Sequence, residues 1–318
     1  MQSNDCLPWV EKYRPKTLDD VISNNHNIKT LKNLIKNGKL PHMLFYGPPG
    51  CGKTSTIHAC IKELYGDSAS YMVMELNGSD DRGIGAIREK IKEFAWSKNF
   101  FNNNVKLIIL DEVDSMTFDA QSALRRIIEL STQTTRFCLI CNYASKVIPA
   151  LQSRCTHFRF SPLDGTELYN KILEISKIEH VNITGNGIRT IIKLSDGDMR
   201  RCYNLLQSAY MLNHIKINES DIYKCANIPQ PEDIHKIFKW LTTNTVIDTY
   251  NNIIRIKIEK SIALVDIIKQ LTDVIKSSNL DMNKKANIMI NLAKIEYNLS
   301  MNCSENLQLL GMIGLFLM

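Results

Sequence analysis

The sequence predicts an α/β protein in which a parallel β-sheet flanked by helices is followed by helical domains. Two observations support this fold class. From Leu40 onward, short β-rich runs alternate with helical patterns of amphipathic period, and such alternation is typical of a parallel sheet wrapped by helices. Beyond Pro162 the β-rich runs stop, and the remaining residues follow helical spacing.

The predicted strands are short and largely apolar, as buried strands of a parallel sheet are. In chain order they are MLFYG (43–47), YMVMELN (71–77), VKLIILDE (105–112), RFCLICN (136–142) and THFRF (156–160). Helical patterns fill the intervals between them, which is the arrangement that crossover connections require.

The rest of the chain divides into two helical parts. Residues 164–227 contain three or four short helical patterns separated by turn-like Asn and Gly residues, and the two prolines of IPQPED (228–233) mark a linker. We therefore expect a sheet domain at 1–162, a small helical domain at 163–228 and a helical C-terminal domain at 229–318.

Two apolar stripes are predicted on the C-terminal helices. Leu264, Ile268, Leu271 and Ile275 share one helix face, and Ile288, Leu292, Ile295 and Leu299 share another. Each stripe packs either into the core of the chain or against helices of another subunit. The chain also ends on GMIGLFLM, an apolar segment that a lone monomer hides with difficulty.

Composition indicates a soluble protein with an intracellular setting. The 318 residues are 44% hydrophobic, enough for packed cores. No secretion signal and no run of about eighteen apolar residues occur, so we expect no membrane association. The nine cysteines are an odd number and fit reduced thiols. Cys138 and Cys141 form one CxxC, but no second pair follows that would complete a zinc site.

A phosphate-binding loop is the strongest motif. GPPGCGKT at 47–54 fits GxxxxGK[ST] and lies between a predicted strand and a predicted helix, which is the context that the motif requires. We expect the phosphates of a nucleoside triphosphate to contact the residues of this loop, which are Gly47, Pro48, Pro49, Gly50, Cys51, Gly52, Lys53, Thr54 and Ser55. The glycines let backbone N–H groups face phosphate oxygens. Lys53 would meet the β and γ phosphates, and Thr54 would bind Mg²⁺.

Two carboxylates follow the apolar run LIIL, at the carboxyl end of a predicted buried strand. This is where α/β sheets build their ligand crevice. Asp111 is suited to hold Mg²⁺, and Glu112 is suited to orient and polarise the attacking water. With the phosphate loop, this pair predicts hydrolysis of a nucleoside triphosphate.

The formal charge of +6 and the pI of 8.7 are compatible with a polyanionic partner, although they do not establish one.

Eight segments carry a resemblance to a known family. They are WVEKYRP (9–15), LPHMLFYGPPGCGKTS (40–55), ELNGSDDRGI (75–84), LDEVDSM (110–116), AQSALRRIIE (120–129), FCLICNY (137–143), ALQSRC (150–155) and GDMRR (197–201). Together they resemble the small subunits of replication factor C, the eukaryotic clamp loader of the AAA+ class. The resemblance covers residues 7 to about 230 and continues more weakly through the helical end.

The resemblance implies an α/β AAA+ P-loop ATPase domain, a helical lid and an all-α collar that joins subunits. It implies that ATP binding and DNA-stimulated hydrolysis, within a hetero-pentamer of replication factor C subunits, open a sliding clamp and load it onto primer-template DNA of any sequence. The expected location is the nucleus, with a cytoplasmic viral replication site as the alternative. A nucleotide-binding scaffold with little hydrolysis is an alternative function. An AAA+ helicase or origin-binding protein lacks support, because no winged-helix extension is apparent after residue 230.

The family also implies roles for residues at the nucleotide. Val10 and Arg14 in VEKYRP would line the adenine pocket. Asn142 corresponds to the first sensor, an amide that hydrogen-bonds the γ-phosphate or the attacking water, although a buried Asn satisfied by backbone is the simpler interpretation. Arg200 corresponds to the second sensor, whose contact makes the angle between domains depend on the nucleotide.

Arg154 in SRC corresponds to an arginine finger, a cation that acts in trans on the γ-phosphate bound by the adjacent subunit. Lys53 and Arg200 already supply the chain's own nucleotide with positive charge, so a further arginine is available for a neighbour. The alternative is a surface salt bridge of little energetic value.

For DNA, Arg82, Ile84 and Arg88 match positions that face the central channel, where contacts with phosphates are sequence-independent and weaken with salt. Arg125 and Arg126 are neighbours on a predicted helix, so they point about 100° apart and at most one faces DNA. We favour Arg125, and a solvated basic face is the alternative.

Two residues depart from the family pattern. Cys51 replaces a usual threonine and puts a thiol beside the nucleotide that oxidation or alkylation would modify. Gly78 replaces a usual alanine.

Overall fold

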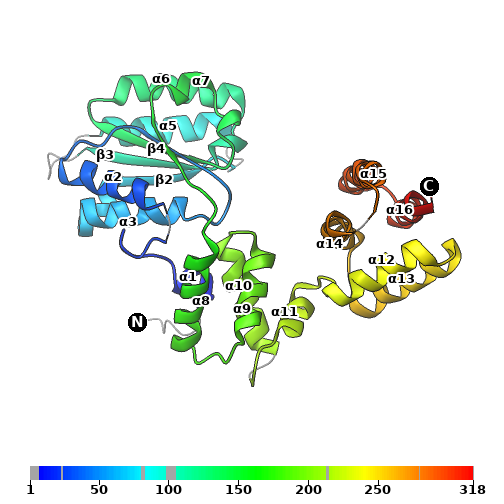
Figure 1. Ribbon diagram of the computed structural model, residues 1–318. Helices are drawn as coiled ribbons and strands as arrows, with labels where there is room; N and C mark the ends of the chain where they lie inside the picture. Colours follow the sequence, from blue (N-terminus) through cyan, green and yellow to red (C-terminus); the bar gives the residue numbers. More distant parts are fainter. Residues whose placement is uncertain are drawn as a thin grey trace. The chain divides into compact units, whose positions relative to one another are not determined.

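The computed structural model describes residues 7–22, 24–79, 83–97, 105–212, 215–278 and 280–317, without the side chains of 83–88 and 317 (Figure 1). The chain divides into two compact units. The first, called the sheet unit here, comprises Met1–Glu179 and Ile191–Asn204, and the second, the helical unit, comprises His180–Thr190 and Leu205–Met318. The predicted division into three domains at 162 and 228 stays a prediction.

The sheet unit contains a five-stranded parallel sheet, which confirms the predicted fold class. The strands are β1 (Met43–Tyr46), β2 (Val73–Asn77), β3 (Lys106–Asp111), β4 (Thr135–Cys141) and β5 (Thr156–Arg159), in the spatial order β2-β3-β4-β1-β5. The register pairs Asn77 with Asp111 and Tyr46 with Cys141. The carboxyl ends of these strands therefore meet at one edge, where the chemistry of the sequence motifs is concentrated.

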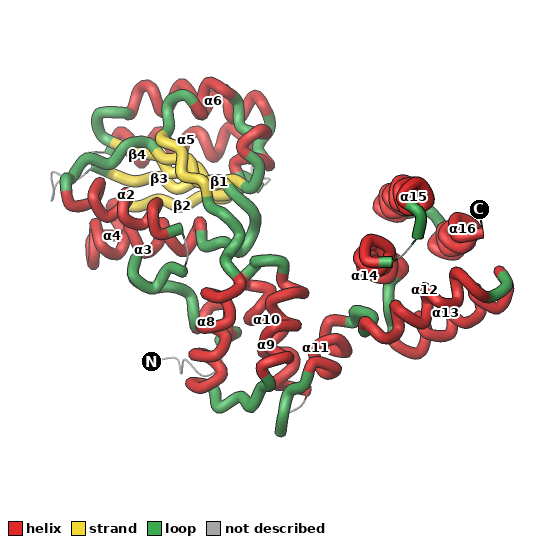
Figure 2. The backbone as a smooth tube through the Cα atoms, in the orientation of Figure 1, coloured by secondary structure: helices red, strands yellow, loops and turns green. Residues whose placement is uncertain are grey.

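Helices cover both faces of the sheet (Figures 1 and 2). On one face lie α2 (Asn25–Lys36) and α3 (Lys53–Tyr65), and on the other lie α5 (Gly83–Trp96), α6 (Phe118–Ser131) and α7 (Pro149–Gln152). The side chains of β3 alternate between the two cores: Leu107 and Ile109 pack with the first pair of helices, whereas Ile108 and Leu110 pack with the others. This alternation follows from the two-residue period of a strand. It also explains why the run is apolar throughout.

Further elements complete the sheet unit. They are α1 (Trp9–Lys12), α4 (Ala69–Met72), α8 (Gly165–Ile178) and the 3₁₀ turns Gly66–Ser68, Val113–Ser115 and Ala144–Lys146. Two further helices, α9 (Gly185–Ser195) and α10 (Met199–Leu212), contribute residues to both units. The first turn of α10, which carries Arg200, belongs to the sheet unit.

The helical unit contains α11 (Glu219–Ala226), α12 (Pro231–Thr243), α13 (Val246–Lys260), α14 (Leu264–Ser277), α15 (Met282–Ser300) and α16 (Glu305–Leu317). Helices α12 to α16 share one apolar core, and both predicted stripes pack into it. Leu264, Ile268, Leu271 and Ile275 are buried, as are Ile288, Leu292 and Ile295, while Leu299 is half-buried. The stripes are therefore core within the chain. Among the described helices, none has the length and apolar character needed to cross a bilayer.

Candidate nucleotide-binding site

The phosphate loop joins β1 to α3, and two of its glycines lie very close to atoms of other segments. A Cβ at Gly47 would lie 2.1 Å from the carbonyl oxygen of Phe160, and a Cβ at Gly50 would lie 1.7 Å from the carboxylate of Asp198. Gly50 also has a φ of +69°, which residues with a side chain rarely adopt. These positions thus admit only glycine without local rearrangement.

Lys53 is held in the loop by three oxygen acceptors. Its ammonium donates to the carbonyl oxygen of Gly47 at 2.7 Å, to that of Pro48 at 2.8 Å and to Oδ1 of Asn142 at 2.9 Å. The side chain is only 8% exposed, and its burial lowers the pKa of Lys53. The cation is therefore fixed at the mouth of the loop, where phosphate oxygens are expected.

Thr54 and Asp111 are paired, although the sequence places them 57 residues apart. The Thr54 hydroxyl donates to Oδ2 of Asp111 at 2.9 Å. The pair offers one hydroxyl and one carboxylate, oxygen ligands of the kind that Mg²⁺ prefers together with substrate phosphates and water. Among the described residues no group of three or more His, Cys, Asp or Glu side chains could hold a metal ion. A Mg²⁺ ion at this pair would therefore depend on phosphate and water for its remaining ligands.

Glu112 is exposed and lines the same pocket. Its φ is +54°, in the left-handed region, and its backbone N–H donates to Oδ1 of Asp111 at 2.8 Å. A non-glycine residue held in this conformation is strained and needs support from its surroundings. Here the support comes from Ser115, whose hydroxyl donates to the Glu112 carbonyl at 2.7 Å.

Asn142 follows β4 and is held by Asp114, a residue that the sequence reasoning missed. Oδ2 of Asp114 accepts the backbone N–H of Asn142 at 3.1 Å and that of Tyr143 at 3.2 Å. The Asn142 side chain is half-buried and points its Oδ1 at Lys53. The expected alternative, a buried Asn satisfied by backbone, is wrong for this side chain because its partner is the Lys53 ammonium.

One pocket of about 410 Å³ brings most of the predicted residues together. Its lining includes Val10, Arg14, Pro49, Gly50, Cys51, Gly52, Lys53, Thr54, Ser55, Asp111, Glu112, Asn142 and Arg200. Gly47 and Pro48 do not line it and contribute the carbonyls that hold Lys53. The pocket thus combines the phosphate loop, the strand-end carboxylates and both sensor positions.

Helix α10 begins directly on the phosphate loop. The Met199 N–H donates to the Gly50 carbonyl at 3.3 Å, and the Asp198 carboxylate accepts the N–H groups of Arg200 at 2.8 Å and Arg201 at 3.3 Å. An aspartate that accepts backbone N–H groups at a helix N-terminus is a typical cap. The cap and the loop therefore fix where Arg200 leaves the helix.

Tyrosines that the sequence reasoning also missed lie on the side of Val10 and Arg14. Tyr13 and Tyr203 both line the pocket, with ring centroids 6.3 Å apart. The Tyr13 hydroxyl donates to Glu179, and Lys12 forms an ion pair with the same carboxylate at 2.6 Å. Burial, the hydrogen bond to Glu179 and its charge raise the pKa of Tyr13. These contacts anchor α1 beside the pocket.

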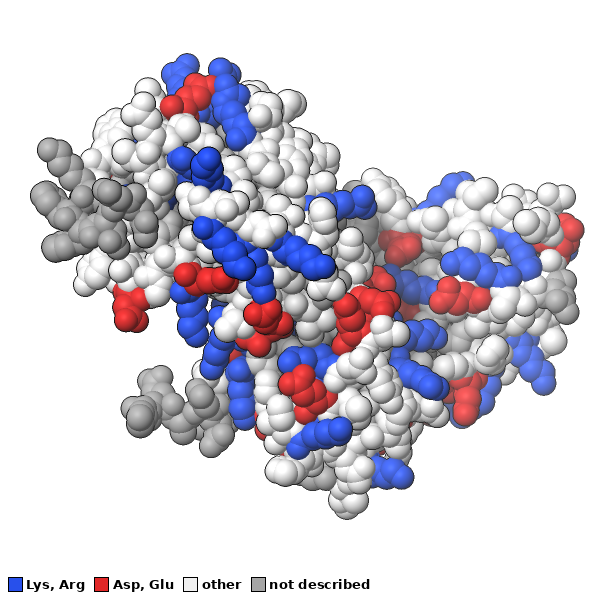
Figure 3. All heavy atoms as spheres, turned by 60° about the vertical axis from the view of Figure 1, so that its left-hand side comes forward, with Lys and Arg blue, Asp and Glu red and all other residues white. Residues whose placement is uncertain are grey.

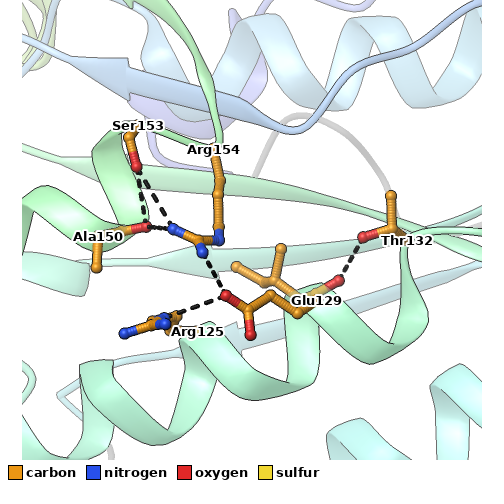
Figure 4. Close-up of polar contacts among 7 residues, drawn as sticks. Arg125, Glu129, Thr132, Ala150, Ser153 and Arg154 are labelled. Atoms are coloured by element: carbon orange, nitrogen blue, oxygen red, sulfur yellow. Dashed lines mark hydrogen bonds and ion pairs between the residues drawn. The ribbon is translucent and has the colours of Figure 1, made fainter.

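Arg154 does not line this pocket. Figure 4 shows it between α6 and α7, where its guanidinium forms an ion pair with Glu129 and donates to the Ala150 carbonyl at 2.7 Å. Arg125 pairs with the same Glu129 oxygen through its Nε at 3.1 Å. A salt bridge within the chain is thus present, as the simpler interpretation of Arg154 expected.

The predicted DNA residues are only partly described. Arg82 lies outside the described residues, as do the side chains of Ile84 and Arg88. Arg125 and Arg126 are exposed on α6. Figure 3 shows basic and acidic side chains mixed over the face that it presents. Their role at DNA stays a prediction.

The two departures from the family pattern have local structural consequences. Cys51 is 1% exposed, its thiol donates to the Pro48 carbonyl at 2.9 Å, and burial raises the pKa of the thiol. The expectation that oxidation or alkylation modifies this thiol is therefore corrected, because a buried thiol with a raised pKa is protected. A Cβ at Gly78 would lie 2.7 Å from the Glu112 carbonyl. Glycine therefore lets the end of β2 lie against the turn that carries Glu112.

Comparisons with known families match most of the chain. The model of the ATPase family associated with various cellular activities (AAA) matches residues 43–163, and that of the replication factor C C-terminal domain matches residues 229–314. A Rad17 P-loop domain matches residues 1–82. Among solved structures, the Thermotoga maritima RuvB Holliday junction branch migration motor is similar with a TM-score of 0.55 at 18% identity, over 81% of this chain and 91% of that chain. This likeness supports the AAA+ fold.

Curated relatives match nearly the whole chain. The probable replication factor C subunit 5 of Dictyostelium discoideum is 50% identical and the human replication factor C subunit 5 is 46% identical, each over 98% of this chain and 91% of the relative. The replication factor C subunit 3 of Saccharomyces cerevisiae is 42% identical, over 98% of this chain and 94% of the relative. Among the small subunits, the sequence motifs look most like the one numbered third in yeast and fifth in human, and these relatives confirm that prediction. The chain therefore belongs to the replication factor C family of clamp-loader ATPase subunits.

Proposed function

We propose that this subunit binds ATP with Mg²⁺ and hydrolyses it within a hetero-pentamer of replication factor C subunits. The cycle opens a sliding clamp and loads it onto primer-template DNA, which stimulates hydrolysis. One observation carries the proposal: a single pocket gathers Lys53, Asp111, Glu112, Asn142 and Arg200. A scaffold that only binds nucleotide requires neither a base nor a sensor, so the site favours hydrolysis over that alternative.

Each residue has a distinct task in the proposed reaction. Lys53 neutralises the β and γ phosphates, and the Thr54 and Asp111 pair holds Mg²⁺, which when bound polarises the phosphate oxygens. Glu112 orients the attacking water and takes up its proton. Asn142 holds that water or the γ-phosphate by hydrogen bonding, and Asp114 keeps Asn142 in place through its backbone N–H.

Val10, Arg14 and Arg200 line the pocket; we propose that Val10 and Arg14 contact the adenine and that Arg200 contacts the phosphates from α10. The first residues of α10 lie against the Gly50 carbonyl, so a shift of the loop on nucleotide binding reaches this helix. We propose that residues 163–228 move as a lid for this reason, and that residues 229–318 form the collar of the ring.

We propose that Arg154 acts on the nucleotide of the adjacent subunit. Arg154 pairs with Glu129 and does not line the chain's own pocket. This supports the role, because a cation outside the chain's own nucleotide site can complete the site of a neighbouring subunit. Arg82, Ile84, Arg88 and Arg125 are proposed to face the DNA in the central channel. We also propose a nuclear location, which the replication function of the family supports.

Glu112→Gln in the assembled complex tests the proposed hydrolysis. ATP binding and clamp opening should persist, because the loop and Lys53 are unchanged, while DNA-stimulated turnover at this site should fall by a factor of about 10² or more. Arg154→Ala should leave ATP binding by this chain intact and impair hydrolysis in the neighbour. Turnover close to wild type in Glu112→Gln would remove Glu112 from its role.

A further inference from the structure

Glu129 is the centre of a cluster formed by α6 and α7. One carboxylate oxygen, Oε1, accepts from Nη2 of Arg154 and from Nε of Arg125, the latter at 3.1 Å (Figure 4). Arg125 is one helical turn before Glu129 on α6, whereas Arg154 comes from the turn after α7, 25 residues away in sequence. The cluster therefore links two arginines that the proposed function assigns to different ligands.

Arg154 is held at two points. Besides the Glu129 pair, its Nη1 donates to the Ala150 carbonyl at 2.7 Å and lies 3.5 Å from the Ser153 hydroxyl. A guanidinium carries five N–H donors in a rigid plane. With Nη1 and Nη2 each fixed by an acceptor, the plane of the group is set, and other N–H groups stay available for a phosphate.

The charges of the cluster also favour such a role. Glu129 brings one negative charge, and the two arginines bring two positive charges, so the cluster keeps a net positive charge. The hydrogen bond from Arg125 and the charge of Arg154 lower the pKa of Glu129. The side chains of Arg154 and Glu129 are 32% and 39% exposed, so the pair remains accessible at the rim.

We propose that Glu129 is a positioning residue for Arg154, which orients the guanidinium toward the nucleotide of the adjacent subunit. This inference rests on the proposed trans role of Arg154. Glu129 touches neither nucleotide and acts only through the orientation of the arginine. An arginine side chain without a partner samples many rotamers, whereas hydrolysis requires the cation at one position. The pair with Glu129 restricts Arg154 to one orientation, and this is the task that an ordinary surface ion pair does not have.

The test uses Glu129→Gln in the assembled complex. All sites are inactivated except that of the adjacent subunit whose nucleotide Arg154 is proposed to reach. Glutamine keeps the shape and one oxygen but removes the charge that holds Arg154. We expect kcat at the neighbour's site to fall about tenfold, since misplacement of a catalytic group weakens transition-state stabilisation. The KM for ATP should change less than twofold, because ground-state binding is supplied by the neighbour's own loop.

The chain offers a matched control in Glu259→Gln on α13. Arg255 pairs with Glu259 through Nε and Oε1 at 3.1 Å with the same i,i+4 spacing as Arg125 and Glu129. No role in nucleotide or DNA binding is proposed for it. Loss of this exposed pair should leave kcat unchanged, and both variants should unfold at temperatures close to wild type, because exposed ion pairs stabilise little.

A double-mutant comparison separates the inference from the proposed function. In the Arg154→Ala background, Glu129→Gln should have no further effect on kcat, because the residue through which it acts is gone. If Arg154→Ala alone leaves the neighbour's turnover intact, the trans role fails. If Arg154→Ala impairs turnover but Glu129→Gln does not, or if the two losses multiply independently, the trans role stands and the positioning role of Glu129 is refuted.

Discussion

His42 lies at the start of β1 with a buried imidazole that resists protonation. Its Nδ1 accepts the backbone N–H of Phe137 at 3.2 Å, so a proton on that nitrogen would break the bond. Its Nε2 is buried without a hydrogen-bond partner among the described residues. Burial and the nearby charge of Arg136 lower the pKa of His42 from 6.5 to about 4.

The lowered pKa predicts a loss of stability in acid. In the unfolded chain His42 binds a proton below its ordinary pKa of 6.5, whereas the folded chain binds it only below about 4. The contribution to stability is therefore fully present above pH 6.5 and is lost as the pH falls toward 4. From these two pKa values the free energy of unfolding should decrease by about 2 kcal/mol between about pH 7 and about pH 5 from this group alone.

His42→Asn removes the titration but offers an amide oxygen to the Phe137 N–H. The loss of the ring costs stability equally at every pH, since the lost packing does not titrate. Urea unfolding of both proteins at about pH 7 and about pH 5 isolates the histidine, because all other titrating groups are common to both. The stability advantage of the wild type should shrink by about 2 kcal/mol at the lower pH. An advantage that stays the same at both pH values would show that the pKa of His42 is not depressed by folding.

Three further predictions concern the pocket. Gly50→Ala should weaken ATP binding at least tenfold in a fluorescent-nucleotide titration, because its Cβ would fall 1.7 Å from the carboxylate that caps α10 and its φ is +69°; unchanged affinity would contradict this. Asp114→Ala should lower kcat about tenfold and leave ATP affinity nearly unchanged, since among the described residues Asp114 accepts only the backbone N–H groups of Asn142 and Tyr143; an equal loss of binding would point to collapse of the loop. Maleimide labelling should modify exposed Cys303 well before Cys51, which is buried and has a raised pKa; mass spectrometry of the labelled peptides measures the order.

The site residues at the sheet edge could be predicted from the sequence, because their positions follow from local sequence patterns. A buried parallel strand is largely apolar, so a polar residue at the end of an apolar run marks the carboxyl end of the strand. Asp111 is the last residue of β3, and Asn142 directly follows β4. The loop around Lys53 carries its glycines at spacings that its backbone conformation requires. These residues line one pocket because parallel strands bring their ends to one edge.

Contacts between segments that are distant in the sequence could not be predicted in this way. The apolar period of α6 places Arg125 and Glu129 on one exposed side, but nothing in that period shows that Arg154 reaches the same carboxylate. The partner of Asp114 could not be predicted from the sequence either. It is one of several acidic residues near Asp111, and only the approach of β4 to the turn after β3 shows that it holds Asn142. A dense cluster of charged residues in a sequence therefore indicates a site, but it does not show which of these residues contact one another.

The contact between Lys53 and Asn142 shows what the tertiary structure adds. An ammonium has three N–H donors, and here the oxygen acceptors are the carbonyls of Gly47 and Pro48 and the side chain of Asn142, 89 residues away. Two acceptors belong to the loop, whereas the third belongs to the end of β4 and is held there by Asp114. A phosphate oxygen that pairs with Lys53 has to replace one of the three. Replacing the rotatable side chain disturbs the loop least, so we expect occupation of the loop and the position of Asn142 to be coupled through one cation.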